Sequence, residues 1–314
     1  MKITIKKRTL NALSFTGIIS LLLLGLSLSI FTYSFSVMGI NNSSVLVKVN
    51  ITNTEPILYF VTVTPDPVEL SPGENTTINC TGRTWDYNGW GDIVRVNATI
   101  YKNTTSVNAV DDNNNHYTNK NCSACTQYSG SASNATCSCF FNVTYYVDNG
   151  TWECNMTVFD TYGVNASNKT QFAINQLLAI NTTEEVDYGN LVVTQTSSKK
   201  SINITNFGNI PLNLSLRSYG GTEDTSSNQN WAMICIQGNM TFNQHRWTLN
   251  ATLPFDNMTP LSNDTVNMNL TIPSRVNDTA VDNDKNQTYI QLRVPLTVGG
   301  YCNGTLIFSA YASS

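Results

Sequence analysis

Cysteine carries most of the chemistry that this sequence of 314 residues offers. A basic and then apolar N-terminal segment directs the chain across a membrane, and on the oxidising side paired thiols form disulfides. Of the eight cysteines, two lie 74 residues apart on predicted strands, four cluster in a polar segment, and two remain in the last third. The spacing predicts four bridges: Cys80–Cys154, Cys122–Cys139, Cys125–Cys137 and Cys235–Cys302. Within the cluster, the nested pairing is one of the connectivities that the spacing leaves open.

The clustered thiols also suit a zinc knuckle, because Cys122-x-x-Cys125 and Cys137-x-Cys139 present four soft ligands. The second pair is closely spaced for a zinc site, and the oxidising compartment favours disulfides. Thiol exchange at Cys122-Ser-Ala-Cys125 would need a thioredoxin-like βαβ pattern, which the surrounding sequence lacks. We therefore expect disulfides and no catalytic thiol.

A second candidate for chemistry is the segment Asp86-x-Asn88-Gly89-x-x-Asp92. Oxygen ligands at alternating positions around a glycine turn are typical of calcium sites, so Asp86, Asn88 and Asp92 would hold a structural calcium ion. The full spacing and the distal glutamate of an EF-hand are missing, and an ordinary turn rich in Asn and Asp has the same composition. Asp282-Asn-Asp284 is a poorer version of this pattern, which we interpret as a solvated loop.

Three aromatic residues, Trp85, Tyr87 and Trp90, lie close together on one predicted loop. Exposed aromatic side chains bind sugars and protein partners, because they combine a large apolar surface with a polar edge. The alternative is that one or two of them close the end of a β-sandwich. The loop is therefore the candidate binding site for carbohydrate or for another surface protein.

Signatures of catalysis are missing from the sequence. The two histidines, His116 and His245, have no Gly-x-Ser-x-Gly context or other triad pattern, and His116 adjoins a run of Asn and Asp that predicts an exposed position. Glu184-Glu185 is an isolated acidic pair without a glycosidase signature. The chain carries no phosphate loop, dinucleotide fingerprint or zinc-protease motif, so we expect a protein that is not an enzyme.

Acceptor triplets for N-linked glycosylation, Asn-x-Ser/Thr, occur about 25 times, against ~9 expected from the composition. In many triplets the middle residue is apolar, so on a strand the Asn and Thr would face solvent while the middle side chain enters the core. The triplets are therefore either modified or simply the pattern of a half-exposed strand. The candidate glycosylation sites are Asn97, Asn142, Asn155, Asn203, Asn213 and Asn269.

Residues 1–36 have the organisation of an export signal. Four basic residues, from Lys2 to Arg8, precede an uncharged apolar stretch, and small residues follow at Ser34 and Ser36. The stretch is also long enough to remain uncleaved as a membrane anchor, which would place the rest of the chain outside the cell. Removing the four basic residues of the leader lowers the formal net charge from −4 to −8, and no basic cluster remains to bind nucleic acid.

Beyond the leader, β-branched and aromatic residues recur between turn signals, and no segment has helical periodicity. The predicted strands include Val45–Ile51, Ile57–Thr64, Ile93–Lys102, Leu191–Thr196 and Val266–Ile272. Many short strands at this spacing predict an all-β protein built from two β-sandwiches in tandem.

About 275 residues beyond the leader suit two such domains. We place a linker or first strand at 37–54, the first sandwich at 55–175 and the second at 176–314. Within the first, segment 111–139 is rich in Asn, Ser and Cys and predicts a long decorated hairpin or loop, because it has too few apolar residues to supply core strands.

The motif Asp148-x-Gly150-x-Trp152-x-Cys154 resembles the Asp-x-Gly-x-Tyr-x-Cys signature that precedes the second bridge cysteine of immunoglobulin domains. The run Gly-Glu-Asn-Thr-Thr-Ile-Asn-Cys at 73–80 resembles the strand that carries the first. The resemblance covers about Glu55–Asn175, and it implies an immunoglobulin-like sandwich.

The resemblance also implies a buried tryptophan after the first bridge cysteine, for which Trp85 and Trp90 are the candidates. Trp152 stands where the family has tyrosine. The hydroxyl bond of the tyrosine corner is therefore lost, although an indole can still fill the corner and donate its N–H.

The second half resembles β-sandwich repeats of exported archaeal envelope proteins. The resemblance rests on Asn206-Phe-Gly-Asn-Ile-Pro-Leu, on the alternating Asn213-Leu-Ser-Leu and on the closing Gly304-Thr-Leu-Ile-Phe-Ser-Ala. It implies a location at the cell surface and no particular activity.

The sequence thus predicts a non-enzymatic structural or adhesive surface glycoprotein, secreted or tethered to the membrane by its N-terminal helix. One alternative is a module that binds carbohydrate or another surface protein through the Trp85–Trp90 loop. A second alternative is a pilin-like filament subunit, in which the apolar N-terminal helix is retained and packs in a fibre.

Overall fold

The computed structural model describes residues 44–279 and 283–313. The expected leader, and with it the anchor and filament hypotheses, falls outside these residues. The chain divides between Asn53 and Thr54, and every described strand lies after that division. The prediction of a strand at Val45–Ile51 is wrong: this segment is exposed and pairs with no strand, so alternation alone did not make it part of a sheet. The described residues include no helix with the length and apolar character needed to cross a membrane.

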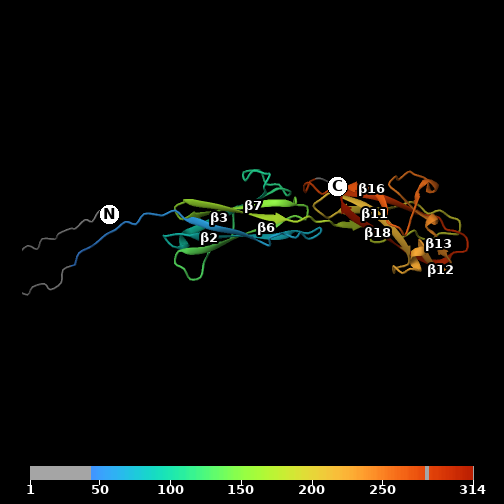
Figure 1. Ribbon diagram of the computed structural model, residues 1–314, viewed down its shortest axis with the longest axis horizontal. Coiled ribbons are helices and arrows are strands. Elements are labelled where there is room, and N and C mark those ends of the chain that lie inside the picture. The colour runs from blue at the N-terminus through green and yellow to red at the C-terminus, as the bar shows by residue number, and fades with distance from the viewer. Residues whose placement is uncertain (1–43, 280–282, 314) are drawn as a thin grey trace, which may run out of the picture. The chain divides into compact units, whose positions relative to one another are not determined.

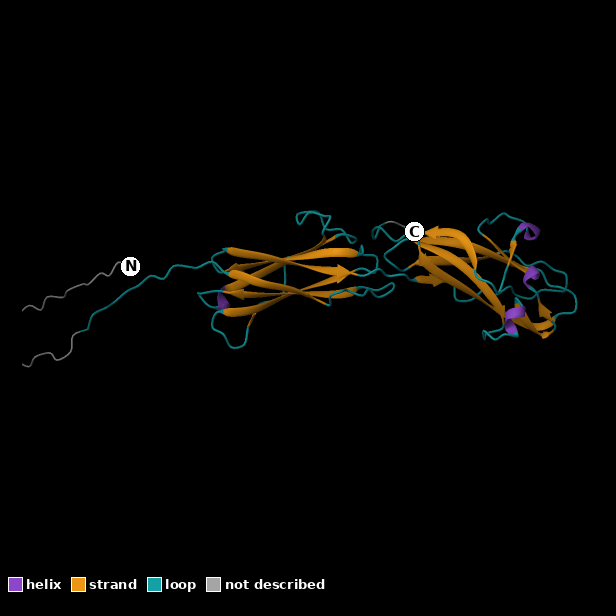
Figure 2. Ribbon diagram, in the orientation of Figure 1, coloured by secondary structure: helices purple, strands orange, loops and turns teal. Residues whose placement is uncertain are grey.

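The first sandwich consists of two four-stranded antiparallel sheets (Figures 1 and 2). One sheet has the strand order β1-β2-β6-β5, and the other has β4-β3-β7-β8. After β1 the chain crosses between the sheets, and Val68 forms a parallel bridge with Ile174 in β8. The strands are β1 Ile57–Thr64, β2 Thr76–Trp85, β3 Ile93–Lys102, β4 His116–Asn119, β5 Thr126–Gln127, β6 Asn134–Val143, β7 Gly150–Asp160 and β8 Asn165–Ile174.

The core of the first sandwich lies between the inner faces of its two sheets. Along β7, alternate residues from Trp152 to Val158 are fully buried, which is the period of two that a strand imposes. The disulfide Cys80–Cys154 joins β2 to β7 and therefore bridges the sheets. Packing is tight at Gly82, where an added Cβ would lie 2.4 Å from the sulfur of Met156, so only glycine fits.

The segment 111–139 includes a hairpin of β5 and β6, but the expectation that it supplies no core strand is wrong. The segment contains β4, which pairs with β3, as well as β5 and the first residues of β6. Tyr117 of β4 packs against the core of the sandwich. These strands are short and mostly polar, so their composition does not distinguish them from a loop.

The second sandwich consists of two five-stranded antiparallel sheets, with strand orders β15-β14-β17-β10-β9 and β13-β12-β18-β11-β16. Its central strand β18 pairs with both β11 and β12. The predicted strand Leu191–Thr196 is wrong, because this segment contributes only the isolated bridge Thr196–Arg293. The strands are β9 Ile180–Thr182, β10 Lys200–Asn206, β11 Leu212–Gly220, β12 Met233–Gln237, β13 Asn239–Met240, β14 His245–Thr248, β15 Thr259–Pro260, β16 Val266–Ile272, β17 Lys285–Leu292 and β18 Gly299–Ala312.

The described chain is thus all-β, with four antiparallel sheets consistent with two β-sandwiches, and this part of the prediction is confirmed. The only helical segments among the described residues are four short 3₁₀ turns: η1 Trp90–Asp92, η2 Asn228–Asn230, η3 Phe242–Gln244 and η4 Phe255–Asn257.

In all six candidate triplets the middle residue is buried and the Asn is not, as predicted, but in the triplet of Asn213 the third residue, Ser215, is buried as well. The middle residue of each triplet is buried: Ala98, Val143, Met156, Ile204, Leu214 and Leu270. The Asn before it is half-buried or exposed in every case. An Asn-x-Thr triplet on a strand therefore places its acceptor amide on the solvent face.

Candidate functional site

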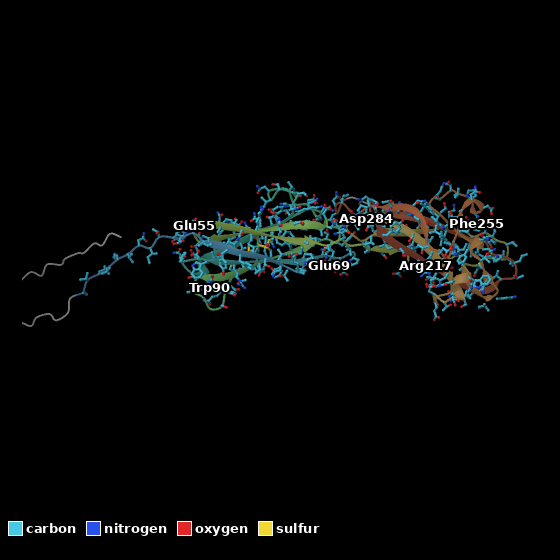
Figure 3. The ribbon with its side chains drawn as sticks, in the orientation of Figure 1. Glu55, Glu69, Trp90, Arg217, Phe255 and Asp284 are labelled. Atoms are coloured by element: carbon cyan, nitrogen blue, oxygen red, sulfur yellow. A yellow bond between two sulfur atoms is a disulfide. The ribbon has the colours of Figure 1, made fainter. Side chains whose placement is uncertain are left out.

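The aromatic loop predicted as a binding site follows β2. Trp85 is the last residue of β2 and is 36% exposed, while Tyr87 is 68% exposed in the following turn. Their rings meet edge to face with centroids 5.9 Å apart. Trp90 begins η1, is half-buried, and its backbone N–H donates to the carbonyl of Ala132 at 2.9 Å (Figure 3). The structure thus brings Trp85 and Tyr87 into direct contact.

Neither Trp85 nor Trp90 is the buried tryptophan of the first sandwich, so that expectation is wrong. The fully buried indole belongs to Trp152 in β7. Its Nε1–H donates to the carbonyl of Asp148 at 2.8 Å, so the indole occupies the corner and donates a hydrogen bond to the backbone upstream. Gly150, between them, has φ +119°, a conformation that favours glycine. Because Trp152 serves as both the corner residue and the core indole, the aromatic residues of the β2 loop remain at the surface.

The carboxylates of Asp86 and Asp92 come together at the same end of the sandwich. Asp86 is buried; its Oδ1 accepts from the Asn88 backbone N–H at 2.7 Å, and its Oδ2 has no hydrogen-bond partner. Burial raises the pKa of Asp86, the Asn88 N–H opposes this, and the charges of Asp92 and Asp160 raise it further. Asp160, at the end of β7, is the member of this cluster that spacing did not reveal.

The geometry lends calcium binding little support. Asn88 is exposed, and its Oδ1 accepts from the backbone N–H of Thr54 at 2.8 Å. Across residues 44–279 and 283–313, no group of three or more His, Cys, Asp or Glu side chains is arranged to hold a metal ion. A calcium ion held by Asp86, Asn88 and Asp92 stays a prediction.

All eight cysteines are paired in the structure. Cys80–Cys154 bridges the sheets of the first sandwich, and Cys235–Cys302 joins β12 to β18 in the second. Cys122–Cys139 and Cys125–Cys137 are nested and fasten the segment before β6 onto that strand. These are the pairs that the spacing predicts, and they leave no free thiol for zinc or for exchange chemistry.

Both histidines are structural. His116 is 2% exposed, contrary to expectation, because it begins β4; its ring nitrogens lie 2.8 Å from an oxygen of Asp111 and 3.0 Å from the carbonyl of Val107. His245 is buried with its Nε2 2.8 Å from the hydroxyl of Tyr188. Burial lowers the pKa of His245 to about 4, so its imidazole is neutral near pH 7.

The prediction of a solvated loop at Asp282–Asp284 is wrong for Asp284, and Asp282 is outside the described residues. Asp284 is buried, with its Oδ2 4.0 Å from Nη1 of Arg275 (Figure 3). Within the described part of the chain neither carboxylate oxygen has a hydrogen-bond partner, so the charge of Arg275 offsets only part of the cost of burying this group. The acidic pair Glu184-Glu185 is exposed, as an isolated surface pair would be.

The acceptor asparagines are distributed over both sandwiches and are accessible. Asn142, Asn203 and Asn269 are exposed, while Asn97, Asn155 and Asn213 are half-buried. Of the 25 triplets, those at Asn41 and Asn42 fall outside the described residues, and none of the other 23 acceptors is buried. The buried asparagines, Asn114, Asn206 and Asn209, all belong to no triplet.

Sequence reasoning missed a second set of exposed aromatic residues next to the loop. Tyr59 and Phe60 of β1 are exposed, and the guanidinium of Arg83 in β2 lies over the rings of Phe60 and Tyr128, 5.6 and 4.2 Å from their centroids. A β-bulge in β1 between Leu58 and Phe60 turns both aromatic residues outward. Strict alternation would have placed one of them in the core. Because of the bulge, the sequence pattern did not predict this surface.

No protein-family model matches the sequence, and neither does any curated protein. Solved structures that match the chain include the chaperone–tip adhesin complex of CFA/I fimbriae biogenesis (13% identity, 78% of this chain and 79% of that chain, TM-score 0.30). Another is the CsuC–CsuE chaperone–tip adhesion subunit pre-assembly complex of Csu pili from Acinetobacter baumannii (11%, 77% and 96%, TM-score 0.35). A tetra-tandem repeat in the extending region of a large adhesion protein is a third (11%, 86% and 53%, TM-score 0.25). At these TM-scores the matches carry no argument, and the architecture of this chain rests on its own sheets.

Proposed function

We propose that this chain is an exported, non-enzymatic surface glycoprotein whose rigid sandwiches serve a structural or adhesive role. One observation carries the proposal: acceptor triplets occur in excess, and none of the 23 acceptor residues that the structure describes is buried. Selection for strands alone explains the alternation, but it does not explain why Asn, rather than any other polar residue, precedes the buried position so often. Sugar chains over both sandwiches would shield the polar surface of the protein.

We further propose that residues 55–175 and 176–314 are separate domains and that the first is immunoglobulin-like. Three features support this assignment: the strand orders β1-β2-β6-β5 and β4-β3-β7-β8, the disulfide between the two sheets, and the indole of Trp152 in the corner position. Residues 1–36 would act as the export signal or as an uncleaved membrane anchor.

Intact mass spectrometry of the protein from its native source tests the proposal. The unmodified chain has a mass of 34.6 kDa, and we expect a heavier, heterogeneous product. Chemical deglycosylation should lower its mass towards that of the polypeptide. Peptide mapping would then assign sugars to individual asparagines. A mass that matches the bare polypeptide, with or without the leader, would refute the glycoprotein assignment.

A second candidate is a binding module that uses Trp85, Tyr87 and Trp90 to recognise carbohydrate or another surface protein. The edge-to-face contact of Trp85 with the largely exposed Tyr87 favours it, because it presents two aromatic side chains side by side. Substituting Trp85 and Tyr87 with Ala should abolish binding on a glycan array or to whole cells. Unchanged binding by the double variant would exclude this surface.

A further inference from the structure

The outer face of the sheet β1-β2-β6-β5 carries a group of aromatic side chains around one guanidinium. We call it the aromatic face: Tyr59, Phe60, Arg83, Trp85, Tyr128 and Phe140. Phe140 of β6 is 50% exposed, and Trp85, Tyr59 and Phe60 are also exposed. Several aromatic side chains exposed on one face are a candidate surface for an occupant, because covering apolar surface is favourable.

Two acceptor asparagines stand directly opposite members of the aromatic face. In the β2–β6 register Asn134 pairs with Trp85, and Asn79 pairs with Phe140. Directly paired residues of an antiparallel sheet project to the same side with Cβ atoms ~5 Å apart. The hydroxyl of Tyr59 also donates to Oδ1 of Asn134 at 3.4 Å. Asn134 is therefore flanked by two exposed aromatic rings.

The same two strands provide a contrasting acceptor. Asn142 of β6 pairs with Thr77 of β2, whose hydroxyl donates to Oδ1 of Asn142 at 2.8 Å. No aromatic residue stands opposite Asn142 in this register. Asn134 and Asn79 thus stand opposite aromatic rings, whereas Asn142 stands opposite a hydroxyl and lies at the end of the sheet away from Trp85.

We propose that the aromatic face is the seat of the chain's own N-linked glycan on Asn134, whose first sugar packs on Trp85 and Tyr59. The proposal rests on the glycoprotein function above and adds a specific site and contact to it. A pyranose has an apolar face of C–H groups and a polar rim, which match an aromatic ring surrounded by amide and hydroxyl groups. Because the sugar is tethered to Asn134, a stacking interaction too weak to capture a free saccharide is sufficient.

The modification requires a lipid-linked oligosaccharide phosphate as the donor. A bond forms between Nδ2 of Asn134 and C1 of the sugar, while the bond from C1 to the phosphate oxygen breaks and the lipid phosphate leaves with the bonding electrons. One of the two Nδ2 protons passes to a base of the transferase. The proton that remains can keep the bond that Nδ2 donates to Oγ of Ser131 at 3.2 Å, so the modified amide still fits its surroundings.

Hydroxyl-radical footprinting of the full glycosylated chain tests the proposal, with site occupancy read from glycopeptides of the same sample. Thr136→Val removes the acceptor triplet but keeps Asn134 and the shape of the strand. We expect oxidation of Trp85 and Tyr59 to rise about threefold in this variant, since a stacked sugar covers most of a ring face. Asn134→Gln should have the same effect, which guards against a folding defect particular to one variant.

Two controls distinguish a glycan packed on the aromatic face from a general change in the reactivity of the protein. Asn142→Gln removes a glycan from the same strand and should leave Trp85 and Tyr59 oxidation unchanged. Tyr162, 74% exposed, should react equally in every sample.

Three results would overturn the proposal: an unmodified Asn134, equal Trp85 oxidation with and without its glycan, or binding of free oligosaccharide to the aromatic face of the glycosylated chain. Sugars at other triplets with none at Asn134 would refute this inference alone. Their absence from every triplet would refute the proposed function as well.

Discussion

Replacing Trp152 by Phe should destabilise the first sandwich more than any other aromatic substitution in its β2 and β7 strands. Trp152 is fully buried, and its ring lies 6.3 Å from those of Tyr117 and Phe172, measured between centroids. Its Nε1–H is the donor to the carbonyl of Asp148. The substitution therefore removes core volume and a hydrogen bond at the same time.

The two contributions can be estimated separately. Removing part of a buried ring without collapse of the site costs ~1–2 kcal/mol. The Asp148 carbonyl then loses its donor, at a further cost of ~1 kcal/mol because this half-buried residue can still reach water. The total is about 2–3 kcal/mol of unfolding free energy. A loss of 2 kcal/mol corresponds to roughly thirtyfold faster exchange of those amide protons that exchange only when the domain unfolds globally.

Hydrogen exchange measured by mass spectrometry on the full chain provides the assay, because it assigns protection to separate strands. Peptides from β7 should exchange faster in W152F, while those from β11 in the second sandwich serve as the internal reference. Trp90→Phe at the half-buried 3₁₀ turn should change stability by less than about 0.5 kcal/mol.

Trp152→Tyr separates packing from the hydrogen bond. A tyrosine hydroxyl at this corner can donate to the backbone upstream, so we expect W152Y to be about 1 kcal/mol more stable than W152F. Equal exchange rates in W152Y and W152F would contradict the stabilisation that we assign to a side-chain hydrogen bond at this corner. Equal rates in W152F and W90F would refute the assignment of Trp152 as the core residue.

Three further predictions concern bridges and buried charges. Replacing Cys80 and Cys154 with Ala should lower the free energy of unfolding by about 4 kcal/mol, because the bridge closes a loop of 74 residues. Calorimetry under non-reducing conditions measures the loss, and an unchanged thermal midpoint would contradict the prediction. His245 has a pKa of about 4 when folded and ~6.5 when unfolded, so stability should be intact above pH 6.5 and decline by about 3 kcal/mol as the pH falls to 4. Urea titrations across this range should show the slope, and His245→Gln should abolish it. Asp86→Asn should raise the thermal midpoint at pH 7, since burial and the charge of Asp92 raise the Asp86 pKa. A lower midpoint in the variant, together with an equal fall in the parent on calcium chelation, would instead indicate a bound cation.

Much of the fold was predictable because strand formation requires a local sequence pattern, in which apolar and polar residues alternate. The alternation in the Asn-x-Ser/Thr triplets predicted buried middle residues such as Met156 and Leu214, and both are fully buried. Cysteine spacing indicated the same four pairs that the structure contains. Both signals depend on positions along one strand or on the order of residues in the chain, so neither needs knowledge of the neighbouring strands.

The candidate sites were less predictable, because exposure depends on what packs against a residue. His116 follows a polar run and yet is buried, since β4 lies against β3 and places the ring under Asp111 and Val107. Trp85 was a candidate for the buried tryptophan of the core, but Trp152 already fills that core position. A bulge in β1 exposes Tyr59 and Phe60 together, which no periodic pattern anticipates.

The sequence by itself determined the class of the protein: extended segments with a period of two, oxidised sulfur pairs and an abundance of acceptor asparagines. The tertiary structure decided which of these asparagines have aromatic neighbours. Trp85 and Asn134 are 49 residues apart in the chain and become partners only through the β2–β6 register. Register is set by backbone hydrogen bonds between strands and by the packing of both faces, which are properties of the assembled sheet and not of either segment alone.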